Sequence, residues 1–296
     1  MHPDPVVTVV IPHHGDPGPT LALVEQLRPQ VPAAHLVVVD DASATPFPGA
    51  AGARVVRRDR NGGFGSAVNS GAAVAEGDLL VVLNSDLKVP HDFITSCAQA
   101  HARFPRAVLS PRVVDEAGHQ TWVGRDFPRI HHQVVEWLTP LARWRHTTAW
   151  HRGVGHDVRS RGSDTEVDWV MGAAMLIPLP AFRAVGGFDE RFFMNCEEID
   201  LQRRLRDSGI ASVALSSPTV VHTGGGSTPS HQRREWLTRS RLQYADKWGS
   251  RTPLQLALIA ATVVNLAVNC VRALLGRDVH PLRTARDELR LIRGRR

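Results

Sequence analysis

Short apolar runs alternate with stretches of helical periodicity along the first half of the chain. Five runs rich in Val and Leu predict strands, over residues 6–12, 35–43, 53–58, 78–86 and 107–115. Three stretches between them carry helical patterns, over residues 18–28, 63–76 and 91–104. Nearly continuous apolar strands joined by helical crossovers are typical of parallel strands covered on both faces. The pattern therefore predicts an α/β fold with a doubly wound, mostly parallel sheet.

The second half of the chain is less regular. Residues 116–165 hold four of the seven tryptophans and little periodicity, and we expect them to form either an aromatic binding surface or a small hydrophobic subdomain. Further strands are expected over 167–178 and 212–222, with a helix from Glu197 to Gly209 between them. We expect one large domain and a basic, helical C-terminal extension, over residues 1–245 and 246–296.

Residues 254–275 form an apolar run long enough to span a bilayer, but four polar side chains interrupt it, namely Gln255, Asn265, Asn269 and Arg272. We favour a helix that lies in the membrane interface, with the arginines that follow it on anionic headgroups. A packed core helix and a transmembrane span are the alternatives.

Polar side chains gather where the predicted strands end. The three ends read Pro12-His13-His14, Asp40-Asp41 and Asn84-Ser85-Asp86. Because ligands bind beyond the carboxyl ends of strands in doubly wound sheets, we expect a ligand crevice at this edge. Asp86 suits a hard divalent ion whose other ligands are diphosphate oxygens and water, although the same triplet is also common in ordinary turns.

The other polar stretches carry two interpretations each. One of Asp40 and Asp41 can accept hydrogen bonds from a ligand while the other caps a turn, and both can belong to a plain turn. The glycine-rich stretch after Asn61 lets the backbone approach a phosphate at the start of the next helix, or is simply a flexible loop. His222, at the end of a strand, can complete a metal site or be structural.

The helix expected from Glu197 places one acid beside its apolar stripe. Leu201 and Leu205 define the inward face, and Glu198, three residues before Leu201, lies on or beside it. The helix dipole favours the ionised form of an acid in the first turn, which suits a general base, and a capping role is the alternative. Asp200 is expected on the opposite side, in a solvated ion pair with Arg203 and Arg204.

Composition narrows the functional classes only slightly. The three cysteines are far apart and without metal-ligand spacing, and no signal peptide is visible, so a cytoplasmic location is expected. The net charge of +6 comes mostly from arginine, which suits phosphate-bearing ligands or anionic membranes. Nucleic-acid binding is not expected, because arginine and aromatic residues do not interleave on one face.

Taken in order, seven motifs over about residues 6–245 resemble the family 2 inverting glycosyltransferases of the GT-A fold, and most closely a rhamnosyltransferase-like branch. They are "VVIP", "VVVDDAS", "NGGFGSAVNSG", "LNSD", "WVMGAAMLIP", "GGFDERFFMNCEEIDL" and "VVHTGGGST". Two positions depart from the family pattern: Ser85 stands where Pro is commoner, and Glu198 where Asp is usual. The second departure leaves Glu197 as an alternative base.

The resemblance implies a role for each matching residue. Asp86 and His222 would bind Mg²⁺ or Mn²⁺, and Glu198 would be the catalytic base. The residues that would bind or line the donor site are Pro12, Asp40, Asn61, Gly63, Asn69, Asn84, Ser85, Trp169 and Gly172. The partners would be a dTDP- or UDP-linked sugar and a saccharide or lipid-linked acceptor, with membrane contact through residues 254–296; a homodimer is left open.

Two further functional classes follow from the same residues. A catalytically inactive module that binds nucleotide-sugars or glycans would keep the pocket but show no transfer. A nucleotidyltransferase would use a similar sheet but release pyrophosphate in place of a nucleoside diphosphate.

Overall fold

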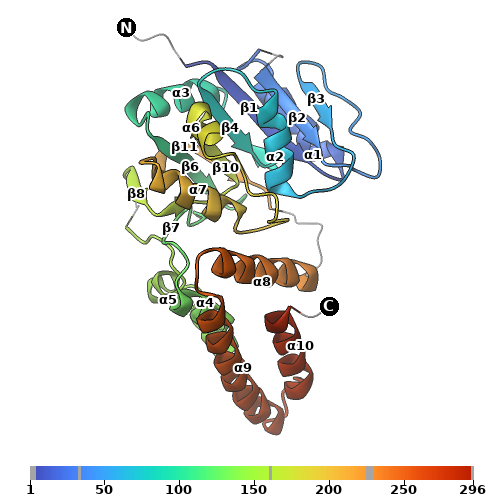
Figure 1. The fold of residues 1–296 in the computed structure, drawn as a ribbon, viewed down its shortest axis with the longest axis vertical. Coiled ribbons are helices and arrows are strands. Elements are labelled where there is room, and N and C mark those ends of the chain that lie inside the picture. The colour runs from blue at the N-terminus through green and yellow to red at the C-terminus, as the bar shows by residue number, and fades with distance from the viewer. Residues whose placement is uncertain (1–4, 33–34, 160–161, 225–229, 295–296) are drawn as a thin grey trace. The chain divides into compact units, whose positions relative to one another are not determined.

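A computed structural model describes residues 5–32, 35–159, 162–224 and 230–294 (Figure 1). The chain forms two compact units. Unit 1 comprises Met1–Arg125 and Arg159–Ser227, and unit 2 comprises Asp126–Val158 and Thr228–Arg296. This division differs from the expected boundary at residue 245, because residues 126–158 pack with the C-terminal helices.

Unit 1 is built on a sheet whose nine strands, within the described residues, run in the order β3-β2-β1-β4-β10-β6-β11-β5, with β8 on β11. Its strands are β1 (Val7–His13), β2 (Leu36–Asp40), β3 (Arg54–Arg57), β4 (Leu79–Leu83), β5 (Leu87–Lys88), β6 (Ala107–Val114), β8 (Thr165–Val167), β10 (Ala174–Pro178) and β11 (Ala211–His222). A separate pair joins β7 (Gly124–Arg125) to β9 (Trp169–Val170).

The directions of the strands confirm the mostly parallel α/β fold. β1 runs parallel to β2 and β4, β2 to β3, and β6 to β11. β10 is antiparallel to both β4 and β6. The expectation of a single strand over 167–178 is wrong. This stretch contains the last residue of β8, followed by β9 and β10 as separate strands. Every residue of β2 and β4 is buried, as expected for strands covered on both faces.

The helices of unit 1 follow the predicted pattern closely in the first half of the chain. They are α1 (Pro17–Leu27), α2 (Phe64–Ala73), α3 (Phe93–Arg103), α6 (Leu179–Ala184) and α7 (Glu197–Asp207). α1 illustrates how they start: the Asp16 side chain accepts from the Gly18 amide at 3.0 Å, and Pro17 occupies the first turn. Its buried residues recur at helical spacing toward the sheet.

Unit 2 is helical. It contains α4 (Ile130–Trp137), the 3₁₀ helix η2 (Thr139–Trp144), α5 (Thr148–Gly153), α8 (Ser230–Lys247), α9 (Arg251–Leu274) and α10 (Pro281–Arg293). Trp137 packs with Leu242, Leu254, Leu258 and Ile292 in a core of its own. This tryptophan thus belongs to a hydrophobic subdomain. In the part of the chain that the structure describes, α9 is the one helix long and apolar enough to cross a membrane.

Candidate active site

Three neighbouring strands bring the predicted polar ends to one edge of the sheet. β1 lies between β2 and β4, and His13 at the end of β1 is in register with Asp40 at the end of β2. Pro12 is half-buried opposite Val39. Asn84, Ser85 and Asp86 follow β4 in the turn into β5, all half-buried. Asp40 and Asp86 therefore lie on the same edge.

Asp86 and His222 form a side-chain pair at this edge. Their Oδ1 and Nε2 atoms are 3.1 Å apart, with 29% and 25% of the respective side chains exposed. The pairing of His222 with Leu87 across β11 and β5 aligns them, and Thr223 donates twice to the Asp86 carbonyl. Burial would raise the pKa of the Asp86 carboxyl, but the hydrogen bond and charge of His222 outweigh it and lower that pKa. Residues 225–229, which follow in the same motif, lie outside the described residues.

A carboxylate facing an imidazole at an accessible edge suits a divalent ion. Among the described residues no group of three or more His, Cys, Asp or Glu side chains gathers as in a closed protein site. Asp86 and His222 could therefore supply two ligands, and the remainder of the coordination would come from a phosphorylated ligand and water. This donor set fits Mg²⁺ or Mn²⁺.

Asp40 and Asp41 both hold loops of the protein. Asp40 is 1% exposed and accepts from the amides of Ser43 (2.9 Å) and Phe47 (3.0 Å) and from the Arg57 guanidinium. Although burial alone would raise its pKa, these hydrogen bonds lower it to about 2. Asp40 thus performs the turn-capping role that the sequence left open, and its contact with a nucleotide base stays a prediction.

Asp41 organises the glycine-rich stretch, a role that the sequence did not predict. Its carboxylate accepts from the amides of Gly62 and Gly63, the latter at 2.8 Å, and pairs with Arg58 at 2.8 Å. Exposed Asn61 accepts from the Gly63 amide at 3.1 Å and lies 3.3 Å from His14 Nε2. This stretch is therefore a defined turn that leads into the first turn of α2.

Gly63 fits where no other residue would. Its φ is +86°, and a Cβ built there would lie 1.8 Å from the carbonyl oxygen of Phe193. Phe193 belongs to the segment before α7, so the glycine turn and the entry to α7 are in direct contact. Asn69 lies within α2 and bonds both backbone groups of Phe188 at 2.9 Å, and its place near the donor stays a prediction. Its amide positions the same segment.

Glu198 lies at the start of α7, against Gly172. A Cβ on Gly172 would lie 3.7 Å from the Glu198 Cβ and Cγ. The next residue, Ala173, accepts from the Asn84 amide at 2.8 Å, so the Asp86 turn and Glu198 are joined through two consecutive residues. Asn195 and Cys196, just before α7, have φ values of +69° and +67°. Such left-handed residues are costly and often occur at functional sites.

The two glutamates differ in exposure and in charge environment. Glu197 is 4% exposed, whereas Glu198 is half-buried with a buried Oε2. Burial raises the pKa of both, and the charge of Glu198 raises that of Glu197 well above its usual range. The positive charge of Arg125 counteracts the rise for Glu198. We expected the helix dipole to favour the ionised form of Glu198, but burial has the larger effect and raises its pKa.

Arg125, which no sequence pattern singled out, comes from β7. Its guanidinium lies 5.4 Å from the centroid of the Trp169 ring, and Arg125 is in register with Trp169 across β7 and β9. Trp169 is 5% exposed, so it supports Arg125 and offers little open ring face to a sugar. Its assignment to the donor site stays a prediction.

Two other expectations need correction. Asp200 is fully buried and not solvated: Arg204 bonds it at 2.9 Å and also donates to the carbonyls of Val185 and Gly187. This pair ties α7 to the preceding turn. His13, one of the polar strand ends expected at the ligand crevice, is buried at 2% exposure and bonds Thr20 at 2.8 Å.

Comparisons of the sequence agree with this geometry. The profile described as Glycosyl transferase family 2 matches residues 8–157. An N-acetylglucosaminyl-diphospho-decaprenol L-rhamnosyltransferase of Mycobacterium tuberculosis is 29% identical over 263 residues, covering 82% of this chain and 81% of that protein. Rhamnosyltransferase WbbL of Escherichia coli is 28% identical over 151 residues, which cover 50% of this chain and 53% of WbbL.

Solved structures share the fold. A mannosyltransferase from Pyrobaculum calidifontis, in complex with GDP-Man and Mn²⁺, superposes with a TM-score of 0.56 at 14% identity and covers 99% of this chain and 87% of its own. GalNAc-T7 with UDP, GalNAc and Mn²⁺ superposes with a TM-score of 0.54 at 16% identity, covering 76% and 45%. At these identities the likeness concerns the GT-A fold alone.

Proposed function

The chain belongs to glycosyl transferase family 2, and from this premise we propose that it is a metal-dependent inverting glycosyltransferase acting on a nucleotide-diphosphate sugar. The proposal rests on two contacts: the Asn84 amide bonds the Ala173 carbonyl, and the neighbouring Gly172 lies against Glu198. They join the carboxylate turn suited to a metal with a half-buried glutamate. Inverting transfer needs these two groups at one site.

The donor is a dTDP- or UDP-linked sugar, and rhamnose is the favoured sugar. Rhamnosyl transfer appears in the names of two relatives. The phosphates of the donor would meet the amides at the start of α2, beyond the turn that Asp41 holds around Gly63. Asp40 and Pro12 would border the nucleoside, and Asn61, Asn84 and Ser85 would line the approach to it.

Asp86 and His222 would hold Mg²⁺ or Mn²⁺. A divalent ion bound there supplies positive charge to the diphosphate as it departs. The protein determines where this ion would bind. The hydrogen bonds from Thr223 and the pairing of β5 with β11 hold the Asp86 turn in place. No reorganisation of this turn is then required during the reaction.

Glu198 is the proposed general base. It removes the proton from the acceptor hydroxyl as the oxygen attacks the anomeric carbon, while the bond from that carbon to the diphosphate breaks on the opposite face. The attack inverts the anomeric configuration, and the proton remains on Glu198. Its greater exposure and the nearby positive charge of Arg125, which lowers the pKa of Glu198 against the effect of burial, favour Glu198 over Glu197.

The acceptor is a saccharide carried on a lipid diphosphate, and the protein acts at the cytoplasmic face of the membrane in the synthesis of cell-wall or surface polysaccharide. The printed name of the mycobacterial relative contains such a lipid-linked sugar. A saccharide on a membrane carrier would require the enzyme to work close to a lipid surface.

The proposal is tested by thermal stabilisation with a panel of nucleotide-sugars and Mn²⁺, followed by detection of products. We expect one donor to stabilise the chain, nucleoside diphosphate to be released on transfer, and EDTA to abolish turnover until Mn²⁺ or Mg²⁺ is restored. Asp86→Asn should remove the metal-dependent stabilisation, with Asp115→Asn on the surface as its matched control. Release of pyrophosphate, or binding with no turnover, would refute the proposal.

A further inference from the structure

The polarity of α9 is reversed along its C-terminal half. From Ala261 onward its buried residues are Thr262, Asn265 and Asn269 besides Ala261 itself. Its exposed residues over the same half include the large apolar side chains Val263, Val264, Val271 and Leu274. A surface helix of a soluble domain normally has its apolar stripe toward the core and its polar face toward water.

The buried polar residues are satisfied inside unit 2. The Trp137 indole donates to Thr262 Oγ1 at 2.9 Å, and Asn265 donates to the Trp137 carbonyl at 3.0 Å and accepts from the Thr139 amide at 3.0 Å. Glu288, 1% exposed, lies 3.3 Å from the Asn265 amide and pairs with Arg234. The inward face of α9 thus makes specific contacts, and its apolar side is left outward.

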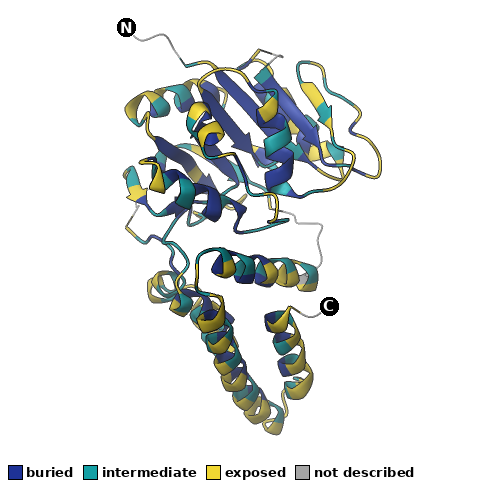
Figure 2. Cartoon of the chain, viewed as in Figure 1, coloured by how far each residue is buried: buried dark blue, intermediate teal, exposed yellow. Residues whose placement is uncertain are grey.

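The most exposed apolar side chains lie at the turn between α9 and α10. Leu274, Leu275 and Leu282 are 88%, 75% and 77% exposed, and Val271 lies one turn before Leu275. Figure 2 shows the exposed class at this turn and along the outer side of α9. Contiguous exposed apolar surface of this kind marks an interaction site.

Positive charge accompanies this surface. Residues 251–296 contain nine arginines and three acidic residues, an excess of six that equals the formal net charge of the whole chain. Arg272, Arg277, Arg283 and Arg286 are exposed on either side of the α9–α10 turn. Arginines close to an anionic lipid surface are attracted to its phosphates.

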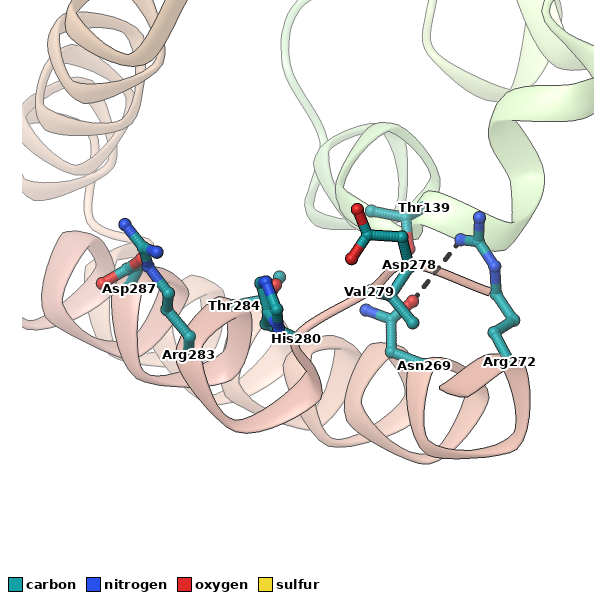
Figure 3. A pocket seen from close by; sticks show the side chains of 9 residues that line it. All are labelled: Thr139, Asn269, Arg272, Asp278, Val279, His280, Arg283, Thr284 and Asp287. Carbon is teal, nitrogen blue, oxygen red and sulfur yellow. Dashed lines mark hydrogen bonds between the residues drawn. The ribbon is translucent and has the colours of Figure 1, made fainter. Parts of the chain in front are cut away.

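A pocket of about 420 Å³ lies within unit 2, and most of its lining residues belong to α9, α10 and the turn between them (Figure 3). Arg272, Arg283 and His280 bring donors suited to a phosphodiester, and Asn269 accepts from Arg272 at 3.5 Å. Asp278 and Asp287 also line the pocket, and their carboxylates could accept from hydroxyl groups. Both signs of side chain suit the headgroup of phosphatidylglycerol, which carries a phosphate and two hydroxyls.

We propose that the outer face of α9 and the α9–α10 turn form a docking surface for an anionic membrane. The leucines of the turn enter the acyl boundary, the surrounding arginines contact lipid phosphates, and the pocket takes one headgroup. The inference deepens the proposed function and rests on it for its biological purpose, since a lipid-linked acceptor lies in such a membrane.

The test is sedimentation of the full chain with lipid vesicles, with and without phosphatidylglycerol in phosphatidylcholine. We expect binding that requires phosphatidylglycerol and weakens as salt is raised. Leu274→Glu and Leu275→Glu should each weaken binding about tenfold or more, because each loses the burial of a leucine in lipid. Val55→Glu, at an exposed valine of β3, is the matched control and should bind as the wild type does.

A second pair of variants tests the headgroup pocket. Arg272→Gln with Arg283→Gln should weaken vesicle binding several-fold, whereas Arg54→Gln with Arg106→Gln, at exposed positions of unit 1, should not. Inorganic phosphate, compared with chloride at equal ionic strength, should not release the chain if the ligand is a lipid headgroup. Selective release by phosphate would show a site for a soluble anion and overturn the membrane assignment.

Other results would also overturn it. Wild-type chain that stays in solution with either vesicle, or leucine variants that bind unchanged, would exclude this surface. A dimer in light scattering that Leu274→Glu dissociates, without vesicle binding by the wild type, would identify a second copy as the occupant. Retention in the membrane after alkaline carbonate washing would show a spanning helix.

The failure of this inference is separable from that of the proposed function. Sugar transfer by the wild-type chain to a short-chain, water-soluble acceptor requires no membrane, and vesicle binding requires no catalysis. Transfer without vesicle binding would remove only the docking surface. Vesicle binding without transfer would remove only the proposed chemistry.

Discussion

In unit 1 the polar side chains of the candidate site stand at strand ends, whereas in unit 2 polar side chains line the inner face of α9. Asp40, Asp86 and His222 follow apolar strands that fill the core of unit 1. In unit 2, Thr262 and Asn265 are buried while Leu274 and Leu275 are exposed. Our proposal accounts for this difference: part of unit 2 would face lipid, whereas the apolar side chains of unit 1 are buried in its own core.

The largest expected effect concerns the chemistry of unit 1. Glu198→Gln should lower kcat roughly a thousandfold, because general base catalysis typically contributes a factor of about 10² to 10⁴. Nucleotide binding with Mn²⁺ should remain, as measured by calorimetry. Glu197→Gln is the matched control and should retain most activity; an equal or greater loss there would move the base to Glu197.

The packing of unit 1 around the site is tested by Gly63→Ala. Both the positive φ and the close Phe193 carbonyl oppose a Cβ there, so we expect a loss of roughly 2–4 kcal/mol in the free energy of unfolding of unit 1. Gly49→Ala separates the two causes, since Gly49 has φ +84° with nothing within 4 Å. Its cost, from denaturant unfolding, should be about 1 kcal/mol. Equal losses would mean that the Phe193 contact relaxes freely.

The corresponding test in unit 2 is Asn265→Leu. A conventional core would tolerate an added apolar residue, but here the change leaves buried Glu288 and the Thr139 amide with fewer partners. We expect a loss of roughly 1–3 kcal/mol in the stability of unit 2. Ala267→Leu, at an exposed position of α9, should leave the same unfolding transition unchanged. Stabilisation by Asn265→Leu would contradict the polar interior.

Acid should weaken unit 1 through Asp40. Its pKa is about 2 in the folded chain, against about 3.9 in an unfolded one. The stabilising contribution is therefore present above about pH 4 and disappears as the pH falls toward 2, amounting to about 2 kcal/mol. Asp40→Asn should remove this part of the acid sensitivity in thermal melts between those pH values. An unchanged pH dependence would show that the carboxylate is not the responsible group.

The smallest effect is expected from Arg125→Met. Loss of the positive charge should raise the pKa of Glu198, so the acidic limb of the kcat/KM profile should move to higher pH. The rate lost at neutral pH should return as the pH is raised. Arg125→Lys, which keeps the charge, should leave the limb in place. A uniform loss at every pH would indicate that Arg125 acts only in packing or substrate binding.

Patterns that are local in sequence predicted much of unit 1. The apolar runs located β1, β2, β4 and β6, and the polar triplets marked the edge at which Asp86 and Asp40 lie. The direction of β10 was not predictable in this way, because a strand buried on both faces has the same composition whether it runs parallel or antiparallel. Arg125 had no signal, since its place depends on the pairing of β7 with β9.

Unit 2 shows a different limit of sequence patterns. Residues 126–158 pack with helices that begin about a hundred residues later, and hydrophobic periodicity in the sequence does not indicate which distant segments pack together. In α9, Asn265 and Asn269 read as interruptions of an apolar run, whereas in the fold they mark its inner face. The interfacial helix that we favoured keeps its apolar side free, and its contact with a membrane stays a prediction.

The hydrogen bond from Asn84 to Ala173 has a consequence for engineering. It extends the pairing of β4 with β10, so the turn that carries Asp86 and the glycine behind Glu198 are attached to the same two strands. Their separation is set by the rigid spacing of a sheet and not by any loop. Under the proposed function, loops of unit 1 outside these two strands could therefore be exchanged while Asp86 and Glu198 keep their separation.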